Sequence, residues 1–199
     1  MRLRARSGMR RERLWNLPNT ITLGRIAGAP FMLFLLAFPG ETGSLLFGFG
    51  FLLISLTDLL DGYLARRAGD VTRIGKLLDP LADKLLVTFA LVALLALGRL
   101  PIWAVPMAAV ILVREIAVTS LRAMASSEGV ILHSSTLGKW KASFQIAALT
   151  ALMIHFPLLW LPAHGIGLVL LCVATGLTLW SGYDYFAAYL GGRQDGELE

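Results

Sequence analysis

Four carboxylates lie in a short stretch of this sequence whose flanks are strongly apolar. Asp58 and Asp61 form one pair, and Asp79 and Asp83 form a second. At about 100° per residue on an α-helix, the members of each pair lie only about 40–60° apart and share one helix face. Four such groups would repel one another strongly without cations. Their oxygens suit Mg²⁺, Mn²⁺ or Ca²⁺, whereas Zn²⁺ prefers sites with His or Cys.

Small and basic residues surround these acids. Gly62, Ala65 and Gly75 would let a bulky ligand approach the backbone closely, and Arg66 and Arg73 suit phosphates. A gap lined by carboxylates, bound metal and arginine is typical of phosphoryl transfer. The structural alternative is a set of acid–base pairs at helix ends. Such pairs would explain one or two of the acids, but hardly four on two facing helices.

The segments that carry the acids belong to a chain that is apolar throughout. It has 199 residues, of which 56% are hydrophobic, and its mean hydropathy is +0.70. Apolar runs recur at close to the length of about 20 residues that a bilayer requires. They predict an all-α integral membrane protein with six transmembrane helices, at about 20–39, 44–66, 77–97, 102–125, 138–156 and 164–189.

Charge divides the ends of the chain from its membrane domain. We expect a basic juxtamembrane segment at 1–15, one six-helix domain at 16–190 and a polar tail at 191–199. By the positive-inside rule, the basic N-terminus and the loops after helices two and four face the cytoplasm. The N-terminal segment either lies along an anionic leaflet or acts as a topology signal alone.

The spacing of the acidic stretch resembles a known family signature. Read as D-x2-D-G-x2-A-R-x8-G-x3-D-x3-D, residues 58–83 agree at all eight positions with the CDP-alcohol phosphotransferases. Enzymes of that family displace CMP from a CDP-linked lipid with an alcohol. The resemblance implies two divalent ions, Mg²⁺ or Mn²⁺, held by Asp58, Asp61, Asp79 and Asp83, with Asp83 also acting as general base. It further implies a CDP-lipid site formed by Asp58, Gly62, Ala65, Arg66, Arg73, Gly75, Asn19 and Thr22.

A second group of cations bears on the acceptor alcohol. Arg114 lies inside the fourth apolar segment, Arg122 lies about two turns further, and Lys139 and Lys141 open the fifth. An arginine at membrane depth needs a partner, such as Glu115, a motif aspartate or an anionic substrate. Glu115 is expected to pair locally with a cation. A phosphate-bearing acceptor would suit the remaining cations, whereas a neutral alcohol would not need them.

Three further stretches narrow the resemblance. The runs "NLPNTITLGR", "REIAVTSLR" and "LGKWK" are similar to the bacterial phosphatidylglycerophosphate synthases, which join CDP-diacylglycerol to sn-glycerol 3-phosphate. This implies a homodimer in the bacterial inner membrane, with an acceptor-phosphate site formed by Arg25, Arg114, Arg122, Lys139 and Lys141. For Arg25 and Lys141, contact with lipid headgroups or a positive-inside anchor is an equally supported interpretation.

Two other functions stay open at this point. A phosphatidylinositol-phosphate synthase would share the eight-residue motif and would also need cations for its anionic acceptor. A divalent-cation transporter would need polar residues that continue toward the far side of the membrane. The apolar runs "LLFGFGFLLISL" and "LLVTFALVALLALG" disfavour such a path. A nucleic-acid partner is not expected.

Overall fold

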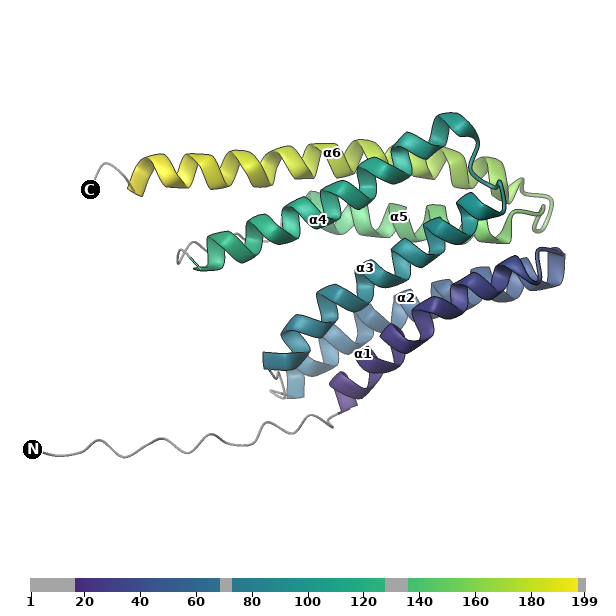
Figure 1. Cartoon of the computed structure of the whole chain (residues 1–199), viewed down its shortest axis with the longest axis horizontal. Helices are drawn as coiled ribbons and strands as arrows, with labels where there is room; N and C mark the ends of the chain where they lie inside the picture. Colours follow the sequence, from purple (N-terminus) through teal and green to yellow (C-terminus); the bar gives the residue numbers. More distant parts are fainter. Residues whose placement is uncertain (1–16, 69–72, 128–135, 197–199) are drawn as a thin grey trace, which may run out of the picture.

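The computed structural model of the chain is a bundle of helices that run alternately up and down (Figure 1). It describes residues 17–68, 73–127 and 136–196. Side chains are described for residues 20–57, 78, 81–127, 138 and 140–191. The predicted basic segment at 1–15 lies outside the described residues, as do the last three residues of the predicted tail.

Six helical segments follow one another within the described residues. They are α1 (Leu17–Gly28) with its continuation η1 (Ala29–Leu36), α2 (Glu41–Ala68), α3 (Arg73–Ala96), α4 (Val105–Ser127) with the short η2 (Ile102–Ala104) before it, α5 (Thr136–Ile154) and α6 (Ala163–Gly196). The prediction of an all-helical chain with six helices is confirmed. The ends shift by a few residues, and α6 continues beyond the predicted end at 189 as far as Gly196.

The first predicted helix, 20–39, is the one that the structure changes most. It is α-helical only to Gly28 and continues as a 3₁₀ helix from Ala29 to Leu36. Pro30 lies in the first turn of this second part. Its ring has no N–H to donate and would clash with the carbonyl four residues earlier, so the α-helical pattern ends there.

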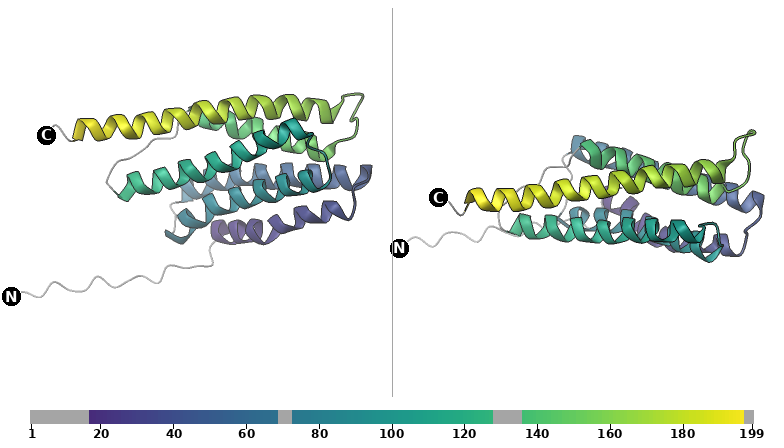
Figure 2. Two further views of the ribbon diagram at one scale, coloured as in Figure 1. Left: turned by 45° about the horizontal axis from the view of Figure 1, so that its top comes forward. Right: turned by 90° about the horizontal axis from the view of Figure 1, so that it is seen from above.

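Two glycines, which have no side chain, let α2 and α6 pack closely against α5. A Cβ atom added at Gly48 would lie 2.6 Å from Cγ1 of Ile154, and one added at Gly167 would lie 2.9 Å from the backbone N of Leu152. Small residues at such crossings allow two helix backbones to approach closely. α5 is therefore held on two sides, while α6 also runs beside α4 (Figure 2).

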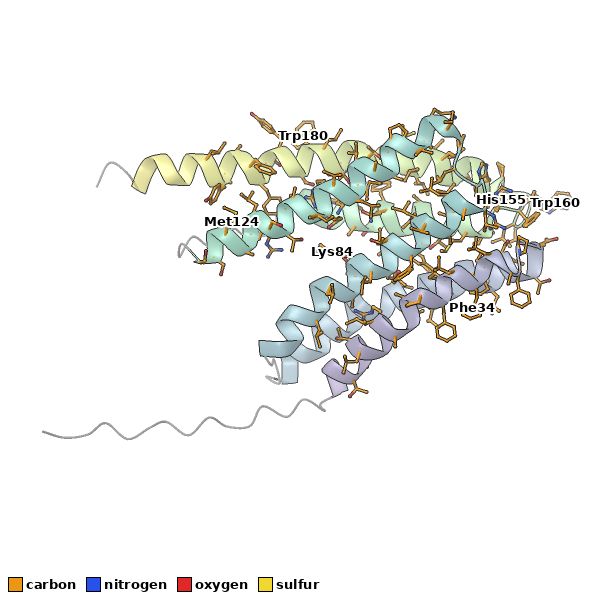
Figure 3. The ribbon with its side chains drawn as sticks, viewed as in Figure 1. Phe34, Lys84, Met124, His155, Trp160 and Trp180 are labelled. Carbon is orange, nitrogen blue, oxygen red and sulfur yellow. The ribbon has the colours of Figure 1, made fainter. Side chains whose placement is uncertain are left out.

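Large apolar side chains both fill the bundle and cover its outside. Leu91, Ile111 and Leu149 are fully buried, whereas Phe34 is 54% and Trp180 66% exposed and both point away from the helices (Figure 3). Within the described residues, Ile102–Ser127 and Ala163–Gly191 are long and apolar enough to cross a membrane. An outer surface of this kind fits contact with lipid.

Arg99 closes the end of the bundle that lies opposite the acidic stretch. Its side chain is buried, with Nη1 donating to the carbonyl of Met153 over 2.5 Å. Nη2 donates to the carbonyl of Pro39 over 2.8 Å and to Ser44 Oγ over 2.7 Å. One guanidinium thus joins the start of α2, the chain after α3 and the end of α5.

Candidate active site

The four motif acids lie on two consecutive helices at one end of the bundle. Asp58 and Asp61 are in the last three turns of α2, and Asp79 and Asp83 are in the first three turns of α3. Residues 69–72 join the two helices and can span at most about 18 Å. The fold therefore brings the two pairs to the same end, as the sequence predicts (Figure 1).

Most of the predicted metal and CDP-lipid residues have side chains outside the described set. Their helices are known, but the assignments of their side chains stay predictions. Among the described residues, no group of three His, Cys, Asp or Glu is placed to hold a metal ion, and only Asp83 of the four acids belongs to that set. The undescribed site side chains are Asn19 on α1, Asp58, Asp61, Gly62, Ala65 and Arg66 on α2, Arg73, Gly75 and Asp79 on α3, and Lys139 on α5.

A cavity of about 460 Å³ lies between α3, α4, α5 and α6. We call it the acceptor cavity. Four basic side chains and two carboxylates line it, a formal excess of two positive charges among the described lining residues. Figure 3 shows Lys84 on the side of α3 that faces α4 and α5. The charged residues are Asp83, Lys84, Arg114, Glu115, Arg122 and Lys141.

This cavity unites three of the predicted acceptor residues with the predicted base. Arg114 and Arg122 come from α4 and Lys141 from α5, and Asp83 reaches the same space from α3. The side chain of Asp83 is exposed there, so a ligand can reach its carboxylate.

Arg114 is held by three residues of α6. Its Nη2 donates to Ser181 Oγ over 2.7 Å, and its Cζ lies 5.8 Å from the ring centroid of Tyr185. Gly182 leaves room for the side chain, because a Cβ atom there would lie 3.3 Å from Arg114 Cγ. Ser181 and Tyr185 are both buried. The guanidinium therefore enters the cavity from a fixed direction.

Glu115 pairs with Lys141, which confirms that this acid has a local cationic partner. The carboxylate also lies 3.8 Å from Nη1 of Arg114. Both Glu115 and Lys141 are largely buried, with 15% and 6% of their side chains exposed. Glu115 thus connects the cation of α5 to the cation of α4.

Two predicted site residues on α1 lie away from the acceptor cavity. Thr22 and Arg25 are buried on this helix, which packs mainly against α3. Neither is among the described residues that line the acceptor cavity. The structure does not bring Arg25 to the other acceptor cations, and its assignment to the acceptor phosphate stays a prediction.

A second, narrower cavity of about 40 Å³ shares Asp83, Lys84 and Glu115 with the first. Gln145 of α5 lines it, 4% exposed, and its Oε1 is buried without a hydrogen-bond partner. No pattern in the sequence singled out Gln145 as a site residue. Its signal was a lone amide in an otherwise apolar run, one turn after Lys141.

The sequence is similar to known proteins over most of its length. Residues 15–180 match the family described as CDP-alcohol phosphatidyltransferase. The chain belongs to this family. It is therefore a phosphatidyltransferase with apolar membrane helices, and the resemblance carried by residues 58–83 is confirmed.

Three curated relatives of this CDP-alcohol phosphatidyltransferase have the name CDP-diacylglycerol–glycerol-3-phosphate 3-phosphatidyltransferase. The protein of Bacillus subtilis is 40% identical, over 87% of this chain and 95% of its own length. Those of Rickettsia bellii and Pectobacterium atrosepticum are 36% and 37% identical, over 87% of this chain and 94% of their own lengths. The similarity thus extends over nearly the whole of each relative.

Proposed function

We propose that this protein transfers the phosphatidyl group of CDP-diacylglycerol to sn-glycerol 3-phosphate, giving phosphatidylglycerophosphate and CMP for phospholipid biosynthesis. The observation that carries the proposal is the acceptor cavity, in which Arg114, Arg122 and Lys141 lie beside Asp83. Its excess of two positive charges matches a phosphate monoester, whose charge is about −1.5 to −2 at pH 7. A neutral acceptor would not offset this charge. The names of the relatives agree with this acceptor.

The reaction forms one P–O bond and breaks another. The terminal hydroxyl of the acceptor attacks the phosphatidyl phosphorus, and CMP leaves with the electrons of the bond that breaks. Asp83 takes the proton of the attacking hydroxyl, since its exposed carboxylate opens to the cavity that holds the acceptor. Arg114, Arg122 and Lys141 hold the phosphate at the other end of the acceptor, so that the hydroxyl is directed toward Asp83.

The predicted metal ligands fit this arrangement by chemistry and by helix position. Carboxylate oxygens suit Mg²⁺ and Mn²⁺. Asp58, Asp61, Asp79 and Asp83 would hold two such ions, and Asp83 already opens to the cavity. The ions would supply positive charge that offsets the charge of the pyrophosphate. Residues for the CDP-lipid would come from the same end of α1, α2 and α3, namely Asn19, Thr22, Gly62, Ala65, Arg66, Arg73 and Gly75.

The orientation of the protein in the membrane follows from the distribution of its positive charges. All six helices would cross the bacterial inner membrane, with the end that holds the acids and the acceptor cavity on the cytoplasmic side. Water-soluble glycerol 3-phosphate then reaches the site from the cytoplasm, while the diacylglycerol tails of the donor stay in the bilayer. The homodimer rests on the family resemblance and stays a prediction.

A CMP-release assay with the purified protein tests the function directly. CDP-diacylglycerol is offered with sn-glycerol 3-phosphate, inositol phosphate or serine, each with and without a chelator. We expect release with glycerol 3-phosphate alone and its loss on chelation. Release with inositol phosphate, and not with glycerol 3-phosphate, would show that the protein is a phosphatidylinositol-phosphate synthase. No release with any of these alcohols would overturn the proposed reaction.

A further inference from the structure

We infer that Gln145 recognises the central hydroxyl of the acceptor and so makes the enzyme selective for a polyol phosphate. The inference rests on the proposed function, because it concerns the acceptor of that reaction. It starts from a buried amide whose oxygen has no partner. A buried acceptor without a hydrogen bond costs free energy, and where such a group lines a cavity a ligand can satisfy it.

Gln145 is the one amide among the described residues that line the narrow cavity. Val87, Leu112 and Ile116 form its apolar sides. Thr88 also lines it, but its hydroxyl donates to the carbonyl of Lys84 over 2.7 Å. The charged residues on this wall are Asp83, Lys84 and Glu115, and Glu115 is paired to Lys141. The amide oxygen of Gln145 is the buried neutral group here that has no hydrogen-bond partner and can accept one from a ligand.

The register along α5 fits one small acceptor molecule. Lys141 and Gln145 are four residues apart on one helix face, which separates them by about 6 Å along the axis. That rise is of the same order as the extent of glycerol 3-phosphate from its phosphate to the hydroxyl on the adjacent, central carbon. A phosphate at Lys141 therefore places a neighbouring hydroxyl near Gln145, while the terminal hydroxyl reaches Asp83, which lines both cavities.

Size points to the same conclusion. The narrow cavity has about 40 Å³, enough for a hydroxyl-bearing carbon but too small for an inositol ring or a lipid headgroup. The larger cavity holds the charged end of the acceptor. Gln145 would then discriminate among acceptors that carry the same phosphate and the same reacting hydroxyl.

The test compares two acceptors that differ only in the central hydroxyl. These are sn-glycerol 3-phosphate and 3-hydroxypropyl phosphate, assayed by CMP release with CDP-diacylglycerol in the full-length protein. We expect the wild type to prefer glycerol 3-phosphate by at least about tenfold in kcat/KM, because a site built to bind a hydroxyl rejects the analogue that lacks it. In Gln145→Leu the preference should fall below about threefold, with the loss confined to glycerol 3-phosphate.

Thr150→Val is the matched control. Thr150 is also buried on α5 and its Oγ1 also has no hydrogen-bond partner, but it lines neither cavity. Its variant should keep the wild-type preference. Gln145→Met, which is unbranched like glutamine, replaces the leucine variant if the latter does not fold.

The outcomes separate the two proposals. If Gln145→Leu or Gln145→Met slows both acceptors equally and keeps the wild-type ratio, Gln145 has only a structural role and the inference is wrong. A wild type that uses both acceptors equally well also overturns it. If the wild type does not use glycerol 3-phosphate at all, the proposed function itself fails.

Discussion

Arg114 on α4 donates a hydrogen bond from Nη2 to Ser181 Oγ on α6 over 2.7 Å, although 67 residues separate the two in sequence. Ser181 donates its own proton to the carbonyl of Thr178 over 3.3 Å, so its oxygen is free to accept from Arg114. The orientation of an acceptor cation thus depends on a helix that supplies only Tyr185 to the described wall of the acceptor cavity.

Gly182→Ala should weaken acceptor binding by displacing Arg114. The new Cβ would lie 3.3 Å from Arg114 Cγ, while Ser181 and Tyr185 restrain the guanidinium. We expect the KM for glycerol 3-phosphate to rise several-fold and that for CDP-diacylglycerol to change little. Steady-state CMP release with each substrate varied in turn measures both.

Gly176→Ala makes the same change on the same helix at a position where a Cβ would meet nothing within 4 Å. Alanine favours a helix over glycine by about 0.5–1 kcal/mol, so this variant should be as stable as the wild type or more so. Its KM values should be unchanged. Equal acceptor KM values in the two variants would contradict the role of Gly182.

Glu115 and Lys141 should prove energetically coupled. Removing one partner of a buried ion pair leaves an uncompensated charge, whereas removing both does not. We expect Glu115→Gln and Lys141→Met each to lower the apparent Tm in detergent, and the double variant to lower it by less than the sum. A double-mutant cycle from thermal unfolding should give a coupling of about 1 kcal/mol or more. Additive effects would show that the pair contributes nothing to stability.

The sequence predicted the helices and the acidic motif well because both signals are local. Runs of about 20 apolar residues mark the helices, and fixed spacing places Asp58, Asp61, Asp79 and Asp83 on shared faces. The partners of Arg114 could not be predicted in this way. Ser181 and Tyr185 meet it only through the packing of α6 against α4, and a single serine or tyrosine in an apolar helix carries no signal of that contact.

Packing also explains two features that the sequence did not reveal, the burial of Arg25 and the cavity beside Gln145. Arg25 resembles a cytoplasmic cation in sequence, but α1 packs against α3 and buries it away from the described wall of the acceptor cavity. Gln145 becomes a candidate site residue only because it lines a cavity. Periodicity along one helix does not reveal a cavity.

Substitutions at Arg99 and Arg122 should have separate effects, one on stability and the other on substrate binding. Arg99 is buried and donates three hydrogen bonds at the end of the bundle remote from Asp83, whereas Arg122 is exposed in the acceptor cavity. Arg99→Met leaves carbonyl acceptors unpaired and should cost about 3 kcal/mol or more, since hydrogen bonds to charged groups contribute about 1.5–3 kcal/mol each. Its KM values should stay near those of the wild type.

Arg122→Met should behave in the opposite way. Thermal unfolding should change little, while the KM for glycerol 3-phosphate should rise at least tenfold because a cation of the phosphate site is lost. Thermal unfolding and CMP release are measured on the same preparations. If Arg99→Met raises the acceptor KM as much as Arg122→Met does, the two ends of the bundle are not independent.

Asp83→Asn should stop turnover without preventing donor binding. Asparagine keeps the shape of the side chain but cannot take the proton of the attacking hydroxyl, and general bases contribute about 10²–10⁴-fold to rate. We therefore expect kcat to fall at least about a hundredfold. Stabilisation by CDP-diacylglycerol in thermal unfolding should persist, because the other motif residues are predicted to bind it and are unchanged. Glu41→Gln is the control, since it neutralises an exposed carboxylate at the start of α2, remote from the cavity, and should leave kcat unchanged.

If Asp83→Asn kept more than a tenth of the wild-type kcat, another group would have to remove the proton. Among the described residues of the acceptor cavity the other carboxylate is Glu115, whose pairing with Lys141 makes it poorly placed for that step.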